Sequence, residues 1–413
     1  MVGRPRALFI APAMPALSGN GLAMRLGMFL EGLAAVAAVE LVVLPLVGPA
    51  TASAALPERL GIAPVIIPVA GRADTVFGLI GRIKEQQARA AAFGKYGRGS
   101  LAAYVSTAVL HDLRLCITGE PFDVVHIGRA YLADAALAIG HNGPKTIDLD
   151  EDDAASCRGT AKLAAEAGNS DDADWASREA DAADTVLDRV KNRFDVFFIA
   201  GVPDREAIRK RHPAIAAELI ENGVPIPVDP RPADDGATLM FVGSFGYPPN
   251  VDAMLWFAQD IWPLIGRSSA MPLRLRIVGR DVPASVAALA NHPGVEVVGE
   301  VADLAPAYAA ATLAIAPLRS GAGTRIKLIE AAAHGVPIVA TSLAAQGLAF
   351  AAPESLWLAD SARGFADRVI EAMADPAERG RRAASAAAIV RESYDRAKLV
   401  ERISCRFREV LAK

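Results

Sequence analysis

The feature that most constrains this chain of 413 residues is an alternation of short apolar runs with helix-length stretches. The helix-length stretches contain polar residues, and the first of them extends from about residue 18 to residue 38. Because parallel strands need crossover connections, this alternation predicts open α/β sheets with parallel strands. In the first half of the chain we expect strands at residues 6–10, 39–44, 65–69, 124–127, 146–149 and 196–199.

A proline-rich segment at residues 225–236 interrupts the alternation, which then starts again. The pattern predicts an N-terminal domain at 1–224, a linker at 225–236, a C-terminal domain at 237–390, and a helix at 391–413 that packs back on the first domain. We therefore expect two doubly wound, Rossmann-like domains facing a cleft, with ligands beyond the carboxyl ends of the strands. In the second domain we expect strands at 238–242, 273–278, 295–298, 313–317 and 336–340, and helices at 250–262 and 324–334.

Composition excludes several classes of protein. Apolar residues make up 52% and charged residues 22%, which is typical of a globular chain. The net charge of −4 does not favour a nucleic-acid partner. Three scattered cysteines favour a reducing compartment and neither a disulfide framework nor a zinc site.

Hydropathy predicts a cytoplasmic protein. Glu31, Glu40 and Pro45 interrupt the most apolar window, residues 26–47, which is too broken to span a membrane. The first apolar run is too short for a secretory signal. Basic and apolar residues mix over 79–98, so peripheral contact with the inner face of the membrane stays open.

The segment with the strongest chemical signal follows the expected strand at 313–317. Gly321 and Gly323 lie in a turn that leads into a helix, where backbone N–H groups can approach and attract an anion. Arg319, Arg325 and Lys327 add positive charge at the same place. This combination predicts binding of a diphosphate.

The helix at 324–334 carries a second feature on one face. Gly323, Lys327, Glu330 and His334 share a stripe, because they are spaced at i, i+4, i+7 and i+11. Glu330 then lies about 10 Å beyond the turn, where its carboxylate can accept hydrogen bonds from the vicinal hydroxyls of a ribose. The alternative is a solvent-exposed Lys327–Glu330 pair. The first interpretation predicts a nucleotide-sugar site.

A family resemblance rests on this segment and its surroundings. The stretch through 327–341 resembles the donor-site signature of glycosyltransferase family 4 (glycosyl transferases group 1), the retaining enzymes of GT-B fold. Further matches are Glu221-Asn-Gly-Val224, Phe241-Val-Gly-Ser244, Ile277-Val-Gly279 and Val297-Val-Gly299. Tyr247-Pro-Pro-Asn-Val-Asp-Ala253, with Trp256-Phe257, resembles a branch containing sugar transferases of exopolysaccharide gene clusters.

The resemblance implies roles for individual residues. Glu330 would bind the donor ribose, and Gly243 and Ser244 would line the opposite wall. The pyrophosphate would be bound by the backbone of Gly321, Ala322, Gly323 and Thr324. Ala322 stands where many members carry a first glutamate, and residues 244–250 lack the family's usual basic pair. We expect Arg325 and Lys327 to replace that charge and to stabilise the leaving diphosphate.

The N-terminal half offers further candidates. Gly19, Gly21 and Arg25 follow the first strand, and the matching GT-B loop faces the donor diphosphate; an ordinary turn with a surface arginine is the alternative. His126 is a catalytic candidate, although strand-end histidines are more often structural. We expect the acceptor side to include Arg129, Asp148 and Asp150. Asp148 belongs to a run of five carboxylates that a solvated loop also explains, and we predict no metal.

These features predict a retaining glycosyltransferase without a cofactor. The donor would be a nucleotide-diphosphate sugar of hexose type, and the acceptor a glycan, a lipid-linked molecule or a small molecule, in bacterial polysaccharide or glycoconjugate synthesis. Two alternatives stay open: a catalytically silent GT-B subunit that binds glycan or a partner transferase, which Ala322 favours, and a GT-B nucleotide-sugar epimerase.

Overall fold

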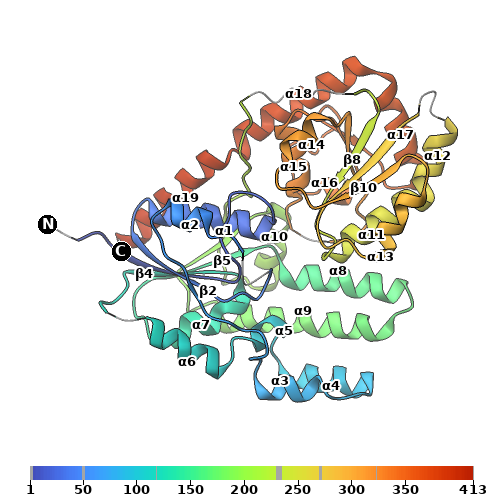
Figure 1. The fold of residues 1–413 in the computed structure, drawn as a ribbon. Helices are drawn as coiled ribbons and strands as arrows, with labels where there is room; N and C mark the ends of the chain where they lie inside the picture. The colour runs from blue at the N-terminus through green and yellow to red at the C-terminus, as the bar shows by residue number, and fades with distance from the viewer. Residues whose placement is uncertain are drawn as a thin grey trace. The chain divides into compact units, whose positions relative to one another are not determined.

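The computed structural model describes residues 3–48, 52–117, 119–228, 235–268, 272–321 and 323–412. The chain divides into two compact units. The first comprises Met1–Glu221 together with Lys398–Lys413, and the second comprises Asn222–Ala397. Each unit is built on one sheet with helices on its faces (Figure 1).

The first unit contains a seven-stranded sheet in the order β3-β2-β1-β4-β5-β6-β7. Its strands pair in parallel, and Phe9 in the central strand lies opposite Leu41 on one side and His126 on the other. The central strands are apolar along their length because helices cover both faces of a parallel sheet. The strands are β1 (Arg6–Ala11), β2 (Ala38–Val43), β3 (Val65–Ile66), β4 (Val124–Gly128), β5 (Lys145–Asp150), β6 (Val196–Ile199) and β7 (Ala217–Leu219).

Helices pack on both faces of this sheet. Leu8 and Val125 belong to one buried apolar cluster, and Phe9 belongs to another with Phe407 of the C-terminal helix. The helices are α1 (Gly21–Ala34), α2 (Ala55–Arg59), α3 (Thr75–Ile80), α4 (Gln86–Tyr96), α5 (Ser100–Ala103), α6 (Thr107–Cys116), η1 (Ala130–Leu132), α7 (Ala133–Ala138), α8 (Asp153–Glu166), α9 (Ser170–Val190), α10 (Val202–Arg211) and α19 (Arg396–Leu411).

The return of α19 to the first unit depends on a glycine in α1. A Cβ added at Gly32 would lie 2.4 Å from Cγ2 of Ile403, so only glycine lets the two helices approach this closely. Ile403 and Phe407 are fully buried as a result. The last helix is therefore part of the hydrophobic core of the N-terminal unit.

The second unit contains a six-stranded parallel sheet in the order β10-β9-β8-β11-β12-β13. Its strands are β8 (Thr238–Val242), β9 (Arg274–Val278), β10 (Val295–Gly299), β11 (Leu313–Ala316), β12 (Ile338–Ala340) and β13 (Trp357–Leu358). Its helices are α11 (Pro248–Trp256), η2 (Phe257–Ile261), α12 (Trp262–Ser268), α13 (Ala284–Ala287), η3 (Ala288–Asn291), α14 (Ala305–Ala309), α15 (Ile326–Ala333), α16 (Ser342–Ala345), α17 (Ala362–Ala374) and α18 (Pro376–Ser393).

Both sheets share one connectivity. In each, the first strand is central, the next two strands build outward on one side, and the chain then crosses to the other side. The direction changes between β1 and β4 in the first sheet and between β8 and β11 in the second. Ligands of doubly wound sheets bind at such switch points, beyond the carboxyl ends of the strands.

The predicted α/β class with two parallel-sheet domains is confirmed. Some boundaries differ: β3 ends at Ile66, and α15 begins at Ile326 rather than at residue 324. Residues 229–234 of the expected linker lie outside the described part of the chain, and the second unit already begins at Asn222. Among the described helices, none combines the length and the apolar character needed to cross a bilayer.

Candidate functional site

The switch point of the second sheet brings two loops together. Gly243 and Ser244 follow β8, while Gly321 and Gly323 lie in the loop after β11. Gly321 and Gly323 both have positive φ, 111° and 77°, a conformation that other residues rarely adopt. A Cβ at Gly321 would lie 2.6 Å from the hydroxyl of Tyr247, so the two loops are in contact. The predicted site residue Ala322 lies outside the described residues.

A third loop, after β9, packs against the first. The backbone N–H of Gly243 donates to the carbonyl oxygen of Val278 at 3.0 Å. A Cβ at Gly279 would lie 1.7 Å from the carbonyl oxygen of Gly243, so the two backbones touch. This contact gives a physical reason for the glycine of the Ile277-Val-Gly279 motif.

Lys327 carries a positive charge to the Gly243 turn. Its Nζ donates to Oδ1 of Asn250 at 2.6 Å and lies 4.1 Å from the centroid of the Phe241 ring. A Cβ at Gly243 would lie only 3.0 Å from this Nζ. Burial, with a smaller contribution from Arg325, lowers the pKa of Lys327 to about 7. A cation from α15 thus stands beside a turn whose own loop has no Lys or Arg in residues 244–250.

Asn250 positions that cation from α11. Its Nδ2 donates to the carbonyl oxygen of Ser244 at 2.7 Å, while its Oδ1 accepts from Lys327. Asn250 is buried, so both ends of its amide are fixed. The sequence showed Asn250 only as part of a motif, because its partner Lys327 is 77 residues away.

The two other basic residues of the segment contact protein groups. Arg325 donates to the carbonyl oxygen of Gly321 at 2.8 Å and also to that of Gly323, so it fixes the shape of the turn. Arg319 donates to both carboxylate oxygens of Asp252, at 2.5 and 3.1 Å, and lies over the Trp256 ring. In the structure Arg325 shapes the loop and Arg319 pairs with α11, and the contact of both residues with a diphosphate stays a prediction.

Glu330 lies further along α15, on the predicted face. Its Oε2 accepts from the hydroxyl of Tyr308, which comes from α14, at 3.2 Å. The Tyr308 ring also stacks on His334, with 4.8 Å between ring centroids. Burial raises the pKa of Glu330 to about 7, although the Tyr308 hydrogen bond and Lys327 both oppose this shift. No local pattern in the sequence pointed to Tyr308.

The switch point of the first sheet differs from the prediction. Gly19 is exposed with φ of 98°, and Gly21 begins α1, whose N-terminus Asn20 caps. Arg25 is only 1% exposed, and its Nε and Nη2 atoms each donate to Asp148 at 2.7 Å. The predicted roles of Arg25 toward the donor and of Asp148 toward the acceptor are therefore wrong: the two form a buried ion pair in the core.

Arg129 and Asp150 adopt strained backbone conformations beside that pair. Their φ angles are 86° and 63°, which non-glycine residues rarely adopt. The Arg129 guanidinium forms ion pairs with Asp150 at 3.0 Å, with Glu151 at 3.2 Å and with Asp153. Arg129 is thus engaged by carboxylates, which corrects its expected contact with an acceptor phosphate. The carboxylates of Asp150, Glu151 and Asp153 are 14–30% exposed.

His126 is a core residue in the structure. It is 0% exposed, its Nδ1 lies 2.8 Å from Oγ1 of Thr146, and its ring stacks on Phe29. Burial lowers the pKa of His126 to about 3, so the imidazole is neutral at physiological pH. The prediction of a catalytic role is wrong, because a side chain without exposed surface cannot contact a substrate.

No grouping of three or more His, Cys, Asp or Glu side chains suited to a metal ion occurs among the described residues. Ser244, by contrast, has a carboxylate partner that the sequence did not reveal. Its Oγ donates to Oδ2 of Asp281 at 3.2 Å. Asp281 and Tyr308 therefore join Asn250 as site residues that sequence reasoning missed.

Two parallel sheets, each with its own switch point, define the class of the protein as a two-domain, Rossmann-like GT-B fold. Several solved structures share this fold. Sucrose-phosphate synthase from Thermosynechococcus elongatus matches 99% of this chain and 100% of its own at TM-score 0.67 and 17% identity. Anabaena Alr3699/HepE, solved with UDP and glucose, matches 99% of both chains at TM-score 0.62 and 15% identity. TarM of S. aureus matches 76% of this chain, which spans 58% of TarM, at TM-score 0.59 and 13% identity.

A family match falls within the second unit. Residues 236–375 match the model of the glycosyl transferases group 1 family, which confirms the resemblance to that family over this stretch. The matched stretch contains both loops of the switch point and the whole of α15. No curated protein matches the chain.

Proposed function

We propose that this protein transfers a sugar from a nucleotide-diphosphate donor to an acceptor, with retention of anomeric configuration. The proposal rests on one arrangement: Lys327 lies beside the Gly243 turn, and Glu330 lies further along the same face of α15. A cation next to a glycine turn suits a diphosphate, and a carboxylate further along the helix suits a ribose. The family match over residues 236–375 supports glycosyl transfer as the reaction.

The donor diphosphate would lie against the glycine loop after β11. The backbone of residues 321–324 would bind it, and Lys327 would exchange the oxygen of Asn250 for a phosphate oxygen. In this buried place a positive charge acts strongly on the negative charge that develops on the leaving diphosphate. Arg325 would contribute indirectly, because it fixes the carbonyl groups of Gly321 and Gly323.

The donor base and the acceptor are proposed more broadly. HepE was solved with UDP-glucose, and TarM with UDP and a GlcNAc-glycerol compound, so UDP-sugars are the first donors to test. The acceptor would be a glycan, a lipid-linked molecule or a small molecule in polysaccharide or glycoconjugate synthesis. The protein's own residues would do the chemistry without a cofactor or a metal, in the cytoplasm.

Replacing Glu330 tests the ribose assignment. We expect Glu330→Ala to weaken UDP binding by about ten-fold or more, because two hydrogen bonds to a charged group are lost. Isothermal titration calorimetry measures this, and Glu296→Ala, an exposed glutamate of β10 in the same unit, is the matched control. Equal UDP affinity in Glu330→Ala and the control would contradict the assignment.

A catalytically silent GT-B subunit is the second candidate, because Ala322 replaces the glutamate that many family members have. Both candidates predict nucleotide binding, but only the enzyme releases nucleoside diphosphate from a sugar donor. A nucleotide-sugar epimerase would instead convert the sugar of the donor, which product analysis by NMR detects. The same spectra report the anomeric configuration of a transferred sugar and so test retention.

A further inference from the structure

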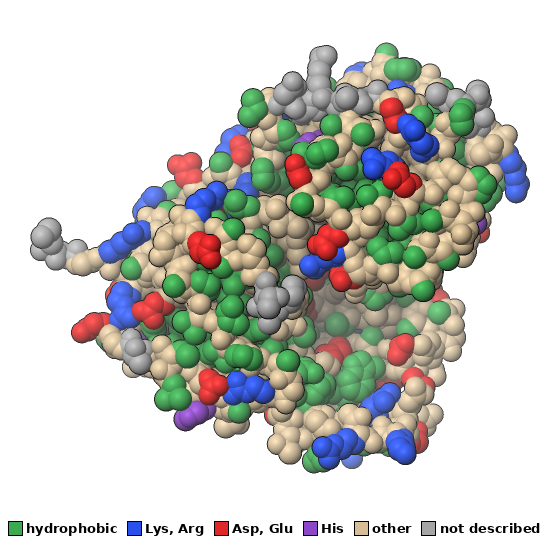
Figure 2. Space-filling view, viewed as in Figure 1, with side chains coloured by type: hydrophobic (Ala, Val, Ile, Leu, Met, Phe, Trp, Pro, Cys, Tyr) green, Lys and Arg blue, Asp and Glu red, His purple; other side chains and the backbone are tan. Residues whose placement is uncertain are grey.

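The segment at residues 75–99 has a charge opposite to that of the chain as a whole. It contains five Lys and Arg residues and one Glu, a net charge of +4, whereas the complete chain carries −4. Figure 2 shows Lys and Arg side chains gathered at the lower edge of the view, where Figure 1 places α3 and α4. The positive charge is therefore concentrated on one small part of the first unit.

Two apolar side chains project from the same segment. Val76 and Leu79, one turn apart on α3, are 55% and 54% exposed. Exposed Arg82 and Lys84 follow directly after the helix, and neither forms an ion pair with any residue that the structure describes. We call Val76, Leu79, Arg82 and Lys84 the α3 patch. The α3 patch combines two exposed apolar side chains with two exposed basic side chains, which is unlike an ordinary solvated helix face.

The inward faces of α3 and α4 are packed, so the α3 patch belongs to an ordered structure. Ile80 and Phe93 are buried, and Phe93 stacks on Trp175 of α9 with 4.0 Å between ring centroids. Phe77 contacts Phe93 and Tyr104 through edge-on rings. The exposure of Val76 and Leu79 is therefore not the result of a loose helix.

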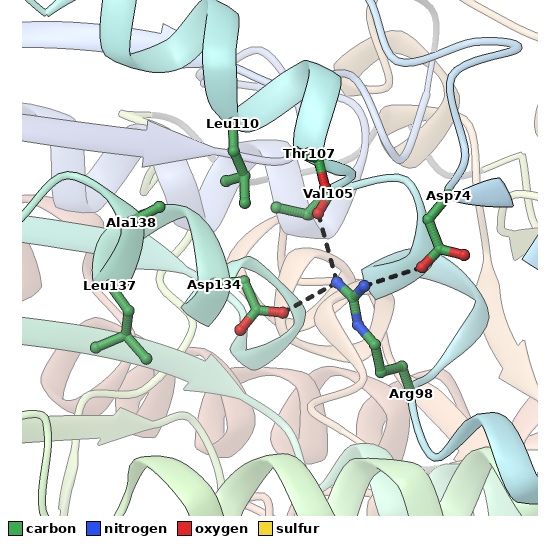
Figure 3. A pocket seen from close by; sticks show the side chains of 8 residues that line it. All are labelled: Asp74, Arg98, Val105, Thr107, Leu110, Asp134, Leu137 and Ala138. Carbon is green, nitrogen blue, oxygen red and sulfur yellow. Dashed lines mark hydrogen bonds and ion pairs between the residues drawn. The ribbon is translucent and has the colours of Figure 1, made fainter. Parts of the chain in front are cut away.

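An ion-pair network attaches both ends of this segment to the domain (Figure 3). Asp74 caps α3 by accepting from the N–H of Phe77 at 2.9 Å, and it also accepts from Tyr96, at the end of α4. Arg98 donates to Asp74 at 3.0 Å and to Asp134 of α7 at 2.9 Å. Asp74, Arg98 and Asp134 are among the residues that line a cavity of about 320 Å³. Because the segment is fixed in advance, docking through the α3 patch would cost little ordering entropy.

We propose that the α3 patch docks on an anionic lipid surface. Val76 and Leu79 would enter the boundary between headgroups and acyl chains, while Arg82 and Lys84 would contact the headgroups. Each basic residue close to an anionic bilayer strengthens binding by about five-fold. Arg89 and Lys95 on α4 add to the local positive potential. A polyanion in solution would use the four charges but would gain nothing from the exposed apolar pair.

The test is sedimentation of the full-length protein with vesicles. We expect binding to vesicles of phosphatidylglycerol mixed with phosphatidylcholine, and little binding to phosphatidylcholine alone. Val76→Glu/Leu79→Glu should lower the partition coefficient by about ten-fold or more. Arg82→Glu/Lys84→Glu should lower it by about 25-fold or more, since two attractive charges are reversed.

Leu115→Glu is the matched control, because Leu115 on α6 of the same unit is 64% exposed and lies outside the α3 patch. It should bind the anionic vesicles as the wild type does, and circular dichroism should show all variants folded. Three results would overturn the proposal. They are no binding of the wild type to anionic vesicles, equal binding of the wild type to both vesicle types, or binding of Val76→Glu/Leu79→Glu to anionic vesicles as strong as that of the wild type. Retention on heparin that persists in Val76→Glu/Leu79→Glu, without vesicle binding, would instead identify a soluble polyanion as the partner.

Discussion

At the scale of single residues, the position of Lys327 decides how the site holds charge. The ammonium is buried against Phe241 and has the amide oxygen of Asn250 as its partner. Burial lowers the pKa of Lys327 from 10.5 to about 7, with a smaller contribution from Arg325, and the uncharged amide oxygen of Asn250 does not offset the lost hydration as a carboxylate would. A diphosphate would supply the missing negative charge and so favour the protonated form.

This environment predicts how donor binding depends on pH. In the free protein Lys327 loses its charge as the pH rises through about 7, so UDP affinity should fall above that pH, by at most about ten-fold per pH unit. Lys327→Arg keeps its charge and should show a flatter dependence. Calorimetric titrations on both sides of neutral pH measure the difference.

Glu330 also titrates near pH 7, so both proteins should be compared in a Glu330→Gln background. That background removes the second titration and leaves the change at Lys327. Parallel pH dependences for the Lys and Arg forms would show that Lys327 does not contact the phosphates.

His126 gives a prediction about stability. Its pKa is lowered from 6.5 to about 3 in the folded state, so below pH 6.5 the unfolded chain binds a proton that the folded chain does not. The His126 contribution to the free energy of unfolding therefore has its full value above pH 6.5. Between pH 6.5 and about 3 the free energy of unfolding should fall with decreasing pH, by at most about 1.4 kcal/mol per pH unit. Urea titrations of wild type and His126→Gln should show a smaller decline in the variant. Equal slopes would place the titration elsewhere.

At the scale of helices and strands, local sequence patterns predicted the positions of several strands correctly. Runs such as 196–199 and 238–242 became strands with the predicted bounds, because apolar β-branched residues between turn signals have few alternatives in an α/β chain. The glycines of the loop after β11 were also predicted. So was the shared helix face of Lys327 and Glu330, because helical spacing fixes which residues share a face.

The partners of charged side chains could not be predicted in the same way. Arg25 and Asp148 are 123 residues apart, and no local pattern shows that they meet in the core. The same limit explains the unexpected pairing of Lys327 with Asn250 and of Arg319 with Asp252. An arginine near a glycine turn gives the same signal in the sequence whether its side chain binds a ligand or a carboxylate of the protein.

The contact between α1 and α19 gives a prediction at this scale. Gly32→Ala places a methyl group against Ile403 and should lower the free energy of unfolding by about 1–3 kcal/mol. Gly159→Ala is the control, because Gly159 lies in α8 with open space at its Cβ, where alanine should stabilise the helix by up to about 1 kcal/mol. Denaturant unfolding measures both. A Gly32→Ala variant as stable as its control would mean that α19 does not pack on α1 as described.

At the scale of the whole molecule, the two units divide the evidence for function. The second unit carries the family match and the Lys327–Glu330 arrangement. The first unit contributes its own switch point, where Arg129 and its carboxylate partners lie, and the α3 patch. Similar solved structures at 13–17% identity share the fold, so the reaction itself has to be tested on this chain.

We propose that the site on α15 binds a nucleotide-diphosphate sugar for transfer. Release of nucleoside diphosphate from a panel of UDP-, GDP- and dTDP-sugars tests it most directly, with wild type beside Lys327→Ala. We predict release from at least one donor by the wild type, reduced by about 100-fold or more in the variant, as expected for loss of a group that stabilises the leaving charge. A folded wild-type protein that releases no nucleotide from any donor, and that no nucleotide stabilises against heat, would contradict a role in sugar transfer.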